Sequence, residues 1–201
     1  MKHPGRKIYH LLGGLFIIAA YIFLGRARGL PALAALTAVA TATDISRFIF
    51  PKFNDFIFRH CGAFIRDSEK RTITGTPWYL MGMLGAFFLY SLPVAVCAVI
   101  FLACGDVSAT VVGERWGTVK ISGVKSLQGT IAFFAASLLS GALAGTYWQG
   151  LPLYVVAAGA LTASVVEILP LKFNDNLTIP IISGAVMQAL IHNAPSIPLL
   201  S

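Results

Sequence analysis

The chain has 201 residues, of which 57% are hydrophobic and only 11% are charged, and its formal net charge is +7. Roughly a quarter of the residues in a soluble domain are charged, so this composition excludes an ordinary soluble enzyme and indicates an integral membrane protein. The excess of Lys and Arg agrees with the positive charge that membrane proteins keep on their cytoplasmic side. It does not by itself distinguish anionic lipid from a polyphosphate as a partner.

Seven apolar segments follow one another along the chain, and several reach the roughly 20 residues that a helix needs to cross a bilayer. They cover residues 8–24, 30–50, 77–90, 92–104, 130–148, 151–169 and 177–192. The third and fourth segments are short. They form either one helix interrupted at Pro93 or a hairpin that turns at residues 91–93.

The distribution of charge favours the hairpin. It places 13 of the 15 Lys and Arg residues on the face that holds the N-terminus, and leaves only Arg26 and Arg28 opposite. A single helix would divide the 15 basic residues 9 to 6, against the positive-inside tendency. We therefore predict an all-α membrane protein, a polytopic bundle of about seven transmembrane helices with a cytoplasmic N-terminus.

In this topology the acidic residues also lie on or near the cytoplasmic side. They are Asp44, Asp55, Asp67, Glu69, Asp106, Glu114, Glu167 and Asp175. A conduction path would need polar groups deeper in the membrane. The pattern therefore favours chemistry at the cytoplasmic surface and disfavours a transporter.

The longest polar stretch, residues 104–129, reads CGDVSATVVGERWGTVKISGVKSLQG. Gly105, Ala109 and Gly113 recur every four residues, which is typical of close helix packing in lipid. The fourth helix is therefore predicted to continue to about Gly113, a length sufficient to span the bilayer. Asp106 then lies inside the membrane-facing part, where a carboxylate either serves a function or forms a structural salt bridge.

Beyond this helix, glycines and hydroxyl side chains alternate with Arg115, Lys120 and Lys125. Such donors and positive charges can surround a polyanion such as a nucleoside triphosphate. The segment is not a Walker A loop, because Val124 separates Gly123 from Lys125. A flexible basic loop that touches lipid headgroups is an equally good alternative.

A second polar cluster, VVEILPLKFNDNLTIPI, covers residues 165–181. Glu167 falls in the last turn of the sixth helix, and Asp175 or Asn176 can cap the seventh. Capping explains one of these residues but not all of them. The acids are expected on the same face as Asp106, and such oxygen ligands suit Mg²⁺ that carries phosphates.

Three smaller clusters complete this face, each with a structural alternative. Asp44 and Arg47 lie three residues apart on the second helix and can pair with each other. Glu69, in RDSEKRTITGTPWY, can belong to a solvated interfacial loop. Arg6 and His10, in RKIYH, can belong to the positive-inside anchor.

In order along the chain, RKIYH, RDSEKRTITG, GDVSATVVGERWG, KSLQG and FNDNLTIP resemble the CTP-dependent lipid-alcohol kinases, which include dolichol kinase, phytol kinase and fungal-type diacylglycerol kinase. The last three segments are the most specific. The resemblance places the CTP-binding region after the GD dipeptide, Gly105 and Asp106. Within this region, Gln128 stands where the family more often has Glu. The implied cofactor-binding residues are Gly113, Arg115, Gly117, Lys120, Lys125, Ser126 and Gly129, to which we add Asn176.

The resemblance implies a kinase that transfers the γ-phosphate of CTP to a membrane lipid alcohol: a polyprenol such as dolichol, phytol or geranylgeraniol, or diacylglycerol. Residues 1–201 would form a single integral membrane kinase domain, with cytoplasmic loops 51–76, 114–129 and 170–176 as its active-site face. We assign Asp106, Glu167 and Asp175 to catalysis and to Mg²⁺, and choose Asp106 as the acceptor of the hydroxyl proton. The basic side chains would bind the triphosphate.

Two other functions remain open on the sequence. A cytidylyltransferase, for example one that acts on phosphatidate, also combines CTP, Mg²⁺ and a membrane lipid. A transporter or lipid-binding protein would turn over no CTP. The expected partners are a lipid alcohol and CTP, without nucleic acid, and the compact chain without a targeting segment suggests a prokaryotic plasma membrane with the active site facing the cytoplasm.

Overall fold

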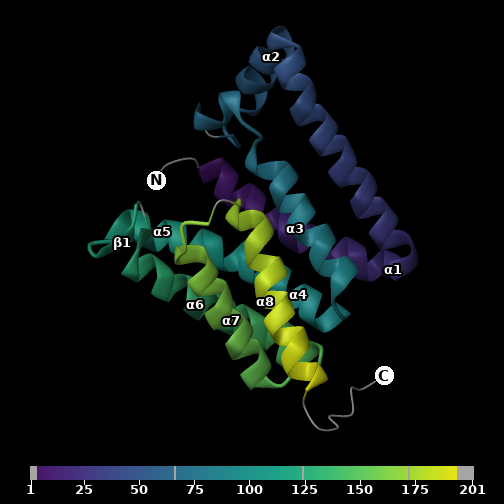
Figure 1. The fold of residues 1–201 in the computed structure, drawn as a ribbon, viewed down its shortest axis with the longest axis vertical. Coiled ribbons are helices and arrows are strands. Elements are labelled where there is room, and N and C mark those ends of the chain that lie inside the picture. Colours follow the sequence, from purple (N-terminus) through teal and green to yellow (C-terminus); the bar gives the residue numbers. More distant parts are fainter. Residues whose placement is uncertain (1–3, 66, 124, 172, 194–201) are drawn as a thin grey trace.

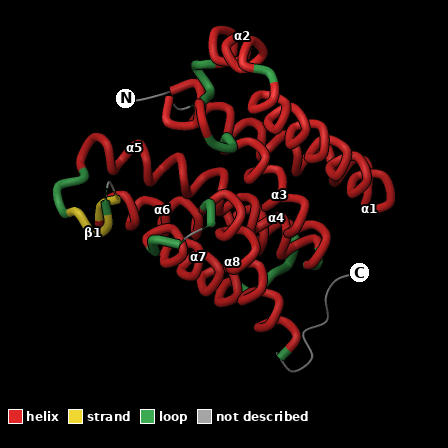
Figure 2. The backbone as a smooth tube through the Cα atoms, turned by 45° about the horizontal axis from the view of Figure 1, so that its top comes forward, coloured by secondary structure: helices red, strands yellow, loops and turns green. Residues whose placement is uncertain are grey.

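The computed structural model describes residues 4–65, 67–123, 125–171 and 173–193, so positions 66, 124 and 172 of the predicted loops lie outside the described residues. In these ranges the chain is almost entirely helical, and Figure 2 shows strands only at one short hairpin. The elements are α1 (Pro4–Ile49), α2 (Pro51–Cys61), η1 (Asp67–Arg71), α3 (Gly75–Leu89), α4 (Leu92–Ile100), η2 (Phe101–Gly105), α5 (Asp106–Trp116), β1 (Lys120–Ser122), β2 (Lys125–Ser126), α6 (Leu127–Gly141), η3 (Ala142–Trp148), α7 (Leu153–Ile168) and α8 (Asp175–His192) (Figure 1). The predicted all-α membrane class is confirmed.

The long helix α1 consists of two helices joined by a sharp bend at Gly25. Gly25 has φ 69° and ψ 167°, a conformation that glycine adopts without the steric penalty of a Cβ atom. The first two apolar segments are therefore separate helices, as predicted, and only this bend connects them. In Figure 1 the second half of α1 runs away from the bend towards α2 at the top of the molecule.

The hairpin between the third and fourth segments is also confirmed. Helix α3 ends at Leu89 and α4 begins at Leu92, so the chain reverses at Tyr90 and Ser91. The helix that follows runs on through the π-helical turn η2 into α5 and ends at Trp116. Residues Leu92–Trp116 form one apolar helix of 25 residues that is long enough to cross a membrane, which confirms the predicted continuation past Cys104.

This continuous helix is the centre of the bundle. Residues 94–99, Phe101 and Leu102 have no exposed surface, and α3, α6, α7 and α8 pack around them. On the outside, large apolar side chains such as Phe16, Phe23 and Leu139 are exposed. A surface of this kind is suited to lipid.

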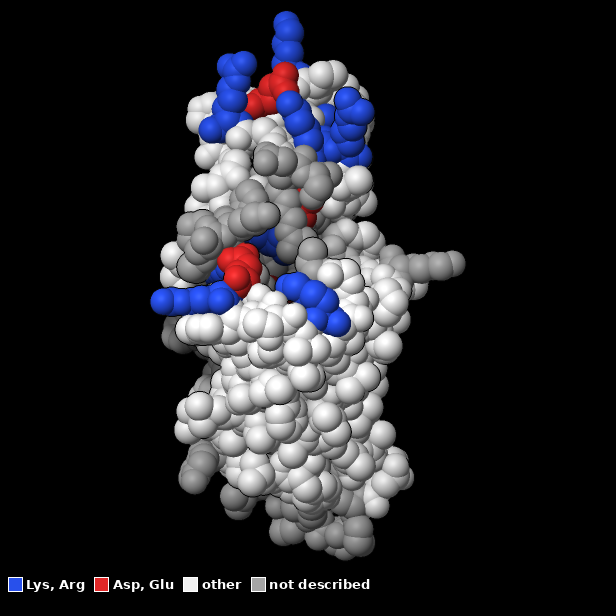
Figure 3. Space-filling view, turned by 90° about the vertical axis from the view of Figure 1, so that its left-hand side faces the viewer, with Lys and Arg blue, Asp and Glu red and all other residues white. Residues whose placement is uncertain are grey.

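Ion pairs of the bundle helices gather at one end of the bundle. There the ends of α1, α3, α5 and α8 and the β1–β2 hairpin meet, linked by Lys7 with Glu114, Lys125 with Asp175, and Asn176 with Gly75. We call this the polar end. Figure 3 shows Lys, Arg, Asp and Glu gathered in the upper half of one face, while the lower half is almost free of charge among the residues drawn in colour.

Candidate functional site

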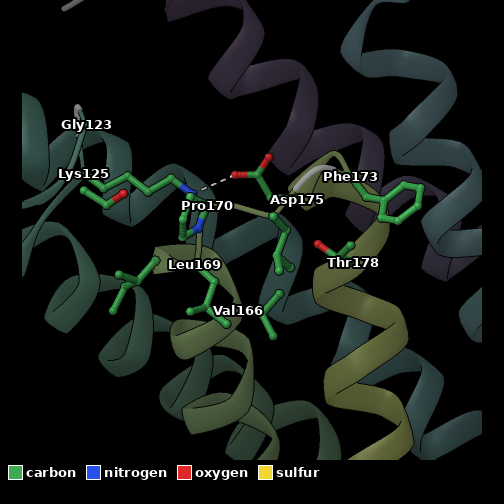
Figure 4. A pocket seen from close by; sticks show the side chains of 11 residues that line it. Gly123, Lys125, Val166, Leu169, Pro170, Phe173, Asp175 and Thr178 are labelled. Carbon is green, nitrogen blue, oxygen red and sulfur yellow. Dashed lines mark hydrogen bonds and ion pairs between the residues drawn. The ribbon is translucent and has the colours of Figure 1, made fainter.

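Lys125 is the centre of the polar end. Its Nζ atom lies 3.0 Å from Asp175 Oδ2 (Figure 4). It also lies 3.4 Å from Glu167 Oε1 and donates a hydrogen bond to the backbone carbonyl of Glu167. Burial by itself lowers the pKa of Lys125, but the Asp175 and Glu167 carboxylates outweigh it and raise the pKa above its ordinary value. The site therefore holds a charged ammonium that ties the hairpin to the end of α7 and the start of α8.

The β1–β2 hairpin positions this lysine. The strands pair antiparallel, with Lys120 opposite Ser126, and Gly123 takes the positive φ of 55° that the turn between the strands requires. Ser126 then caps α6, because its Oγ accepts a hydrogen bond from the backbone N–H of Gly129 at 3.2 Å. Lys125 is thus held between a strand pairing on one side and a capped helix on the other.

The glycines predicted to bind CTP bring α5 and α6 into close contact. A Cβ atom on Gly113 would lie 3.2 Å from Ser126 Oγ, and one on Gly129 would lie 2.9 Å from the carbonyl oxygen of Ala109. Gly117 packs against Ser126 in the same way. Close packing is sufficient to explain glycine at these positions, and a direct contact with CTP stays a prediction.

The predicted basic residues are distributed around the contact between α5 and α6. Lys120 and Arg115 are exposed, and the Arg115 guanidinium lies over the ring of Trp116, 5.0 Å from its centroid. Gln128 holds the segment before β1, because Oε1 accepts from the Val119 N–H at 3.2 Å. Among the described residues, neither Lys120 nor Arg115 is shown in an ion pair like that of Lys125 with its two carboxylates. Both side chains can therefore turn towards a ligand.

A cavity of about 250 Å³ lies beside Lys125 and Asp175. Val166, Leu169 and Phe173 supply apolar parts of its lining, and Ser122 and Thr178 supply hydroxyl groups (Figure 4). The cavity is bounded by the hairpin, the α7–α8 connection and the first turn of α8. An open space beside a charged ammonium is suited to an anionic ligand.

A second group of predicted residues meets around Gly75, at the start of α3. Asn176 is buried and donates from Nδ2 to the Gly75 carbonyl at 3.2 Å. A Cβ atom on Gly75 would lie 3.3 Å from Asn176 Nδ2, 3.6 Å from Glu69 Oε1 and 4.0 Å from an Arg6 guanidinium nitrogen. The structure therefore brings Arg6, Glu69 and Asn176 together from three distant parts of the chain.

Asp106 and His10 lie deeper. Asp106, at the start of α5, is close enough to act electrostatically on Glu167 and on Tyr79. The Tyr79 hydroxyl donates to the His10 carbonyl, and the two rings pack with their centroids 4.4 Å apart. The predicted acids thus gather at one end of the bundle. However, no three Asp, Glu, His or Cys side chains of the described residues are arranged to hold a metal ion.

Sequence reasoning missed Lys7. It lies next to Arg6 in the RKIYH motif, is buried, and pairs with Glu114 at the end of α5 over 2.9 Å. The signal was its place in that motif. It could not be used because nothing in the sequence shows that the start of α1 reaches the end of α5.

Asp44 and Arg47 form a closed ion pair away from the cavity. Asp44 Oδ1 lies 2.8 Å from Arg47 Nε, and its Oδ2 accepts from the Thr74 backbone N–H at 2.7 Å. Arg47 also donates to the Thr72 carbonyl at 3.0 Å. The pair therefore fixes the segment before α3, which agrees with the structural alternative.

The fold and this site define a polytopic α-helical membrane protein with a charged site at one end of an apolar bundle. The chain is 30% identical over 92% of its length to CTP-dependent diacylglycerol kinase 1 of Eremothecium gossypii, and 29% identical over 74% of its length to the kinase of that name from Saccharomyces cerevisiae. It is 29% identical over 92% of its length to the phytol kinase of Synechocystis sp.. It spans 66%, 59% and 78% of these three proteins respectively.

No family model matches the chain, and no solved structure matches it either. The chain belongs to the family of CTP-dependent lipid-alcohol kinases, as its ordered motifs predicted.

Proposed function

We propose that the chain is a kinase that transfers the γ-phosphate of CTP to the hydroxyl group of a membrane lipid alcohol. The observation that carries the proposal is the Lys125 ammonium between Glu167 and Asp175, beside a cavity at the polar end of an apolar bundle. Phosphoryl transfer requires chiefly that the reacting groups are positioned and that the charge on the phosphates is neutralised. Cations and carboxylates gathered next to lipid-facing helices meet both needs.

The basic residues would bind the triphosphate. Lys125 is held in place by its strand and is protonated, and Lys120 and Arg115 lie exposed on either side of the α5–β1 connection. Asp106 would accept the proton of the lipid hydroxyl, since it lies at the membrane side of the acidic cluster. The transfer breaks the bond between the γ-phosphorus and its bridging oxygen, forms a bond to the lipid oxygen, and leaves CDP.

The family resemblance implies Mg²⁺, and the donor set is compatible with it. Glu167 and Asp175 both reach one ammonium, so their oxygens can also share one cation. Mg²⁺ is commonly held by one or two carboxylates together with substrate phosphates, so a closed site of three protein ligands is not required. When bound, Mg²⁺ would neutralise charge on the phosphates, with Glu167 and Asp175 as its protein ligands and Asp106 acting through water.

The lipid alcohol would present its hydroxyl at the polar end while its tail stays among the apolar helices. Relatives named for diacylglycerol and for phytol are similarly distant from this chain, so both alcohols are candidates, together with a polyprenol. Residues 1–201 would act as one kinase domain. Its loops 51–76, 114–129 and 170–176 would face the cytoplasm, because they carry most of the Lys and Arg.

The deciding experiment uses the purified chain in detergent micelles with CTP labelled at either the α- or the γ-phosphate. Diacylglycerol, phytol, geranylgeraniol and a polyprenol are offered separately. We expect the γ-label, and not the α-label, to appear in a lipid product. Transfer of the α-label would show a cytidylyltransferase, and absence of CTP turnover with every alcohol would favour a transporter or a lipid-binding protein.

A further inference from the structure

The position of Lys125 bears on how a cation and a nucleotide enter the site. Its Nζ atom lies 3.0 Å from Asp175 Oδ2 and 3.4 Å from Glu167 Oε1, and the backbone carbonyl of Glu167 accepts a third contact. A Mg²⁺ ion binds carboxylate oxygens at about 2.0–2.1 Å. The ammonium and the ion therefore cannot occupy the space between these two carboxylates together.

We propose that Lys125 is an internal counter-cation: it holds Glu167 and Asp175 until a nucleotide triphosphate draws its ammonium away and a divalent cation takes its place. This inference rests on the proposed function. It makes Lys125 a positioning residue for the metal ligands as well as a ligand of the phosphates. The chain would consequently bind divalent cations weakly without nucleotide and strongly with it.

Burial explains why the Glu167 carboxylate needs a counter-charge before substrate binds. Glu167 is buried at the end of α7, and Asp175 and Asp106 both act on it electrostatically. A buried charge without a partner is strongly destabilising. Lys125 supplies the compensating charge as long as no nucleotide is bound.

The local structure allows Lys125 to turn away. A lysine has a flexible four-carbon stem, and this one begins on a two-residue strand next to the Gly123 turn. The cavity of about 250 Å³ adjoins both its side chain and Asp175. Phosphate oxygens placed there would replace the carboxylates as acceptors, so the ammonium would keep its hydrogen bonds while it releases the metal ligands.

The test measures binding of Mn²⁺ alone, without CTP or lipid, by electron paramagnetic resonance on the purified full chain in detergent. Lys125→Met removes the counter-cation, and Lys125→Gln is a second variant that keeps a polar side chain. Lys125→Arg keeps the charge. Lys52→Met is the matched control, because Lys52 is an exposed lysine of α2 away from the site. Far-ultraviolet circular dichroism verifies the helical content of each protein.

We expect Lys125→Met and Lys125→Gln to bind Mn²⁺ about tenfold more tightly than the unaltered chain, within the roughly five- to 150-fold range of couplings between linked sites. Lys125→Arg and Lys52→Met should not gain affinity. Adding Asp175→Asn to Lys125→Met should abolish the gain, because the gain requires that carboxylate.

An unchanged Mn²⁺ affinity in a neutral Lys125 variant of normal helicity would overturn the inference. A gain that survives loss of the Asp175 carboxylate would overturn it as well. Because the measurement involves neither CTP nor a lipid, its failure is distinguishable from failure of the proposed function, which the label-transfer experiment detects separately.

Discussion

Two ion-pair clusters of this protein contain the same kinds of residue in different surroundings. In the Asp44–Arg47 pair the side chains are 1–7% exposed, and both residues are hydrogen-bonded to the segment before α3. In the Lys125 cluster the exposed fractions of Lys125, Glu167 and Asp175 are 26%, 9% and 47%, and a cavity adjoins it. The first pair is buried and closed by its own hydrogen bonds, whereas the second is partly exposed and adjoins an open space. The comparison shows that access, more than residue type, separates a structural pair from a candidate site.

The largest expected effect is a loss of stability when the Asp44–Arg47 pair is broken. Asp44→Ala leaves the Arg47 guanidinium buried without its partner, and should lower the free energy of unfolding by about 3–5 kcal/mol. Unfolding in mixed micelles, followed by circular dichroism, measures it. The matched control is Asp55→Ala, because Asp55 pairs with Lys70 over 3.4 Å at the surface and such pairs contribute about 1 kcal/mol or less. Equal losses in the two variants would remove the distinction between buried and open pairs.

The next effect concerns activity. Lys125→Met should reduce transfer of the γ-label to lipid by about 100- to 1,000-fold, the usual effect of removing one preorganised donor from a reacting group. Lys52→Met should retain the activity of the unaltered chain. If Lys125→Met stayed within a few-fold of the unaltered chain, the Lys125 cluster would be structural in the same sense as the Asp44 pair.

A smaller effect is expected where α5 meets α6. In Gly113→Ala the new methyl group would lie 3.2 Å from Ser126 Oγ, and overpacking of this kind costs about 1–3 kcal/mol. Gly13→Ala is the control, because a Cβ atom there meets nothing within 4 Å. Thermal unfolding of both variants tests the packing role. A large loss of CTP affinity in Gly113→Ala at unchanged stability would show instead that this glycine contacts the nucleotide.

The smallest effect is on the dependence of stability on pH. The folded pKa of Lys125 is raised above its ordinary value of 10.5, because the Asp175 and Glu167 carboxylates outweigh its burial. Its pairing therefore stabilises the fold fully below that value, and the contribution disappears only as the pH rises through the higher folded pKa. The difference in melting temperature between the unaltered chain and Lys125→Met should stay constant from neutral to mildly alkaline pH. A difference that vanished near neutrality would contradict this assignment.

Much of the fold could be predicted from the sequence because lipid imposes simple rules on it. Apolar length located the helices, and the distribution of Lys and Arg chose the hairpin between α3 and α4 over one long helix. The continuation of the fourth helix to about Gly113 followed from small residues at a spacing of four, and in the structure this helix ends at Trp116. The sharp bend at Gly25 was not predicted, because the backbone conformation of a single glycine does not change the hydropathy profile.

Less of the candidate site could be predicted. Lys125, Glu167 and Asp175 were all selected, but Lys125 is 42 and 50 residues away from its two partners. Patterns within a few residues carry no information about such a contact. For the same reason the sequence named Gly113 and Gly129 without showing that they pack against each other's helices, and it left Lys7 without a role.

The sequence by itself determined that this is a helical membrane protein of the lipid-alcohol kinase family, because hydropathy, charge and ordered motifs are all local or additive properties. Only the tertiary structure decided which charges meet. It placed Asp44 and Arg47 in a closed pair and set Lys125 between two carboxylates beside a cavity. Helix packing sets those distances, and the strength of an ion pair depends on distance and burial rather than on residue type.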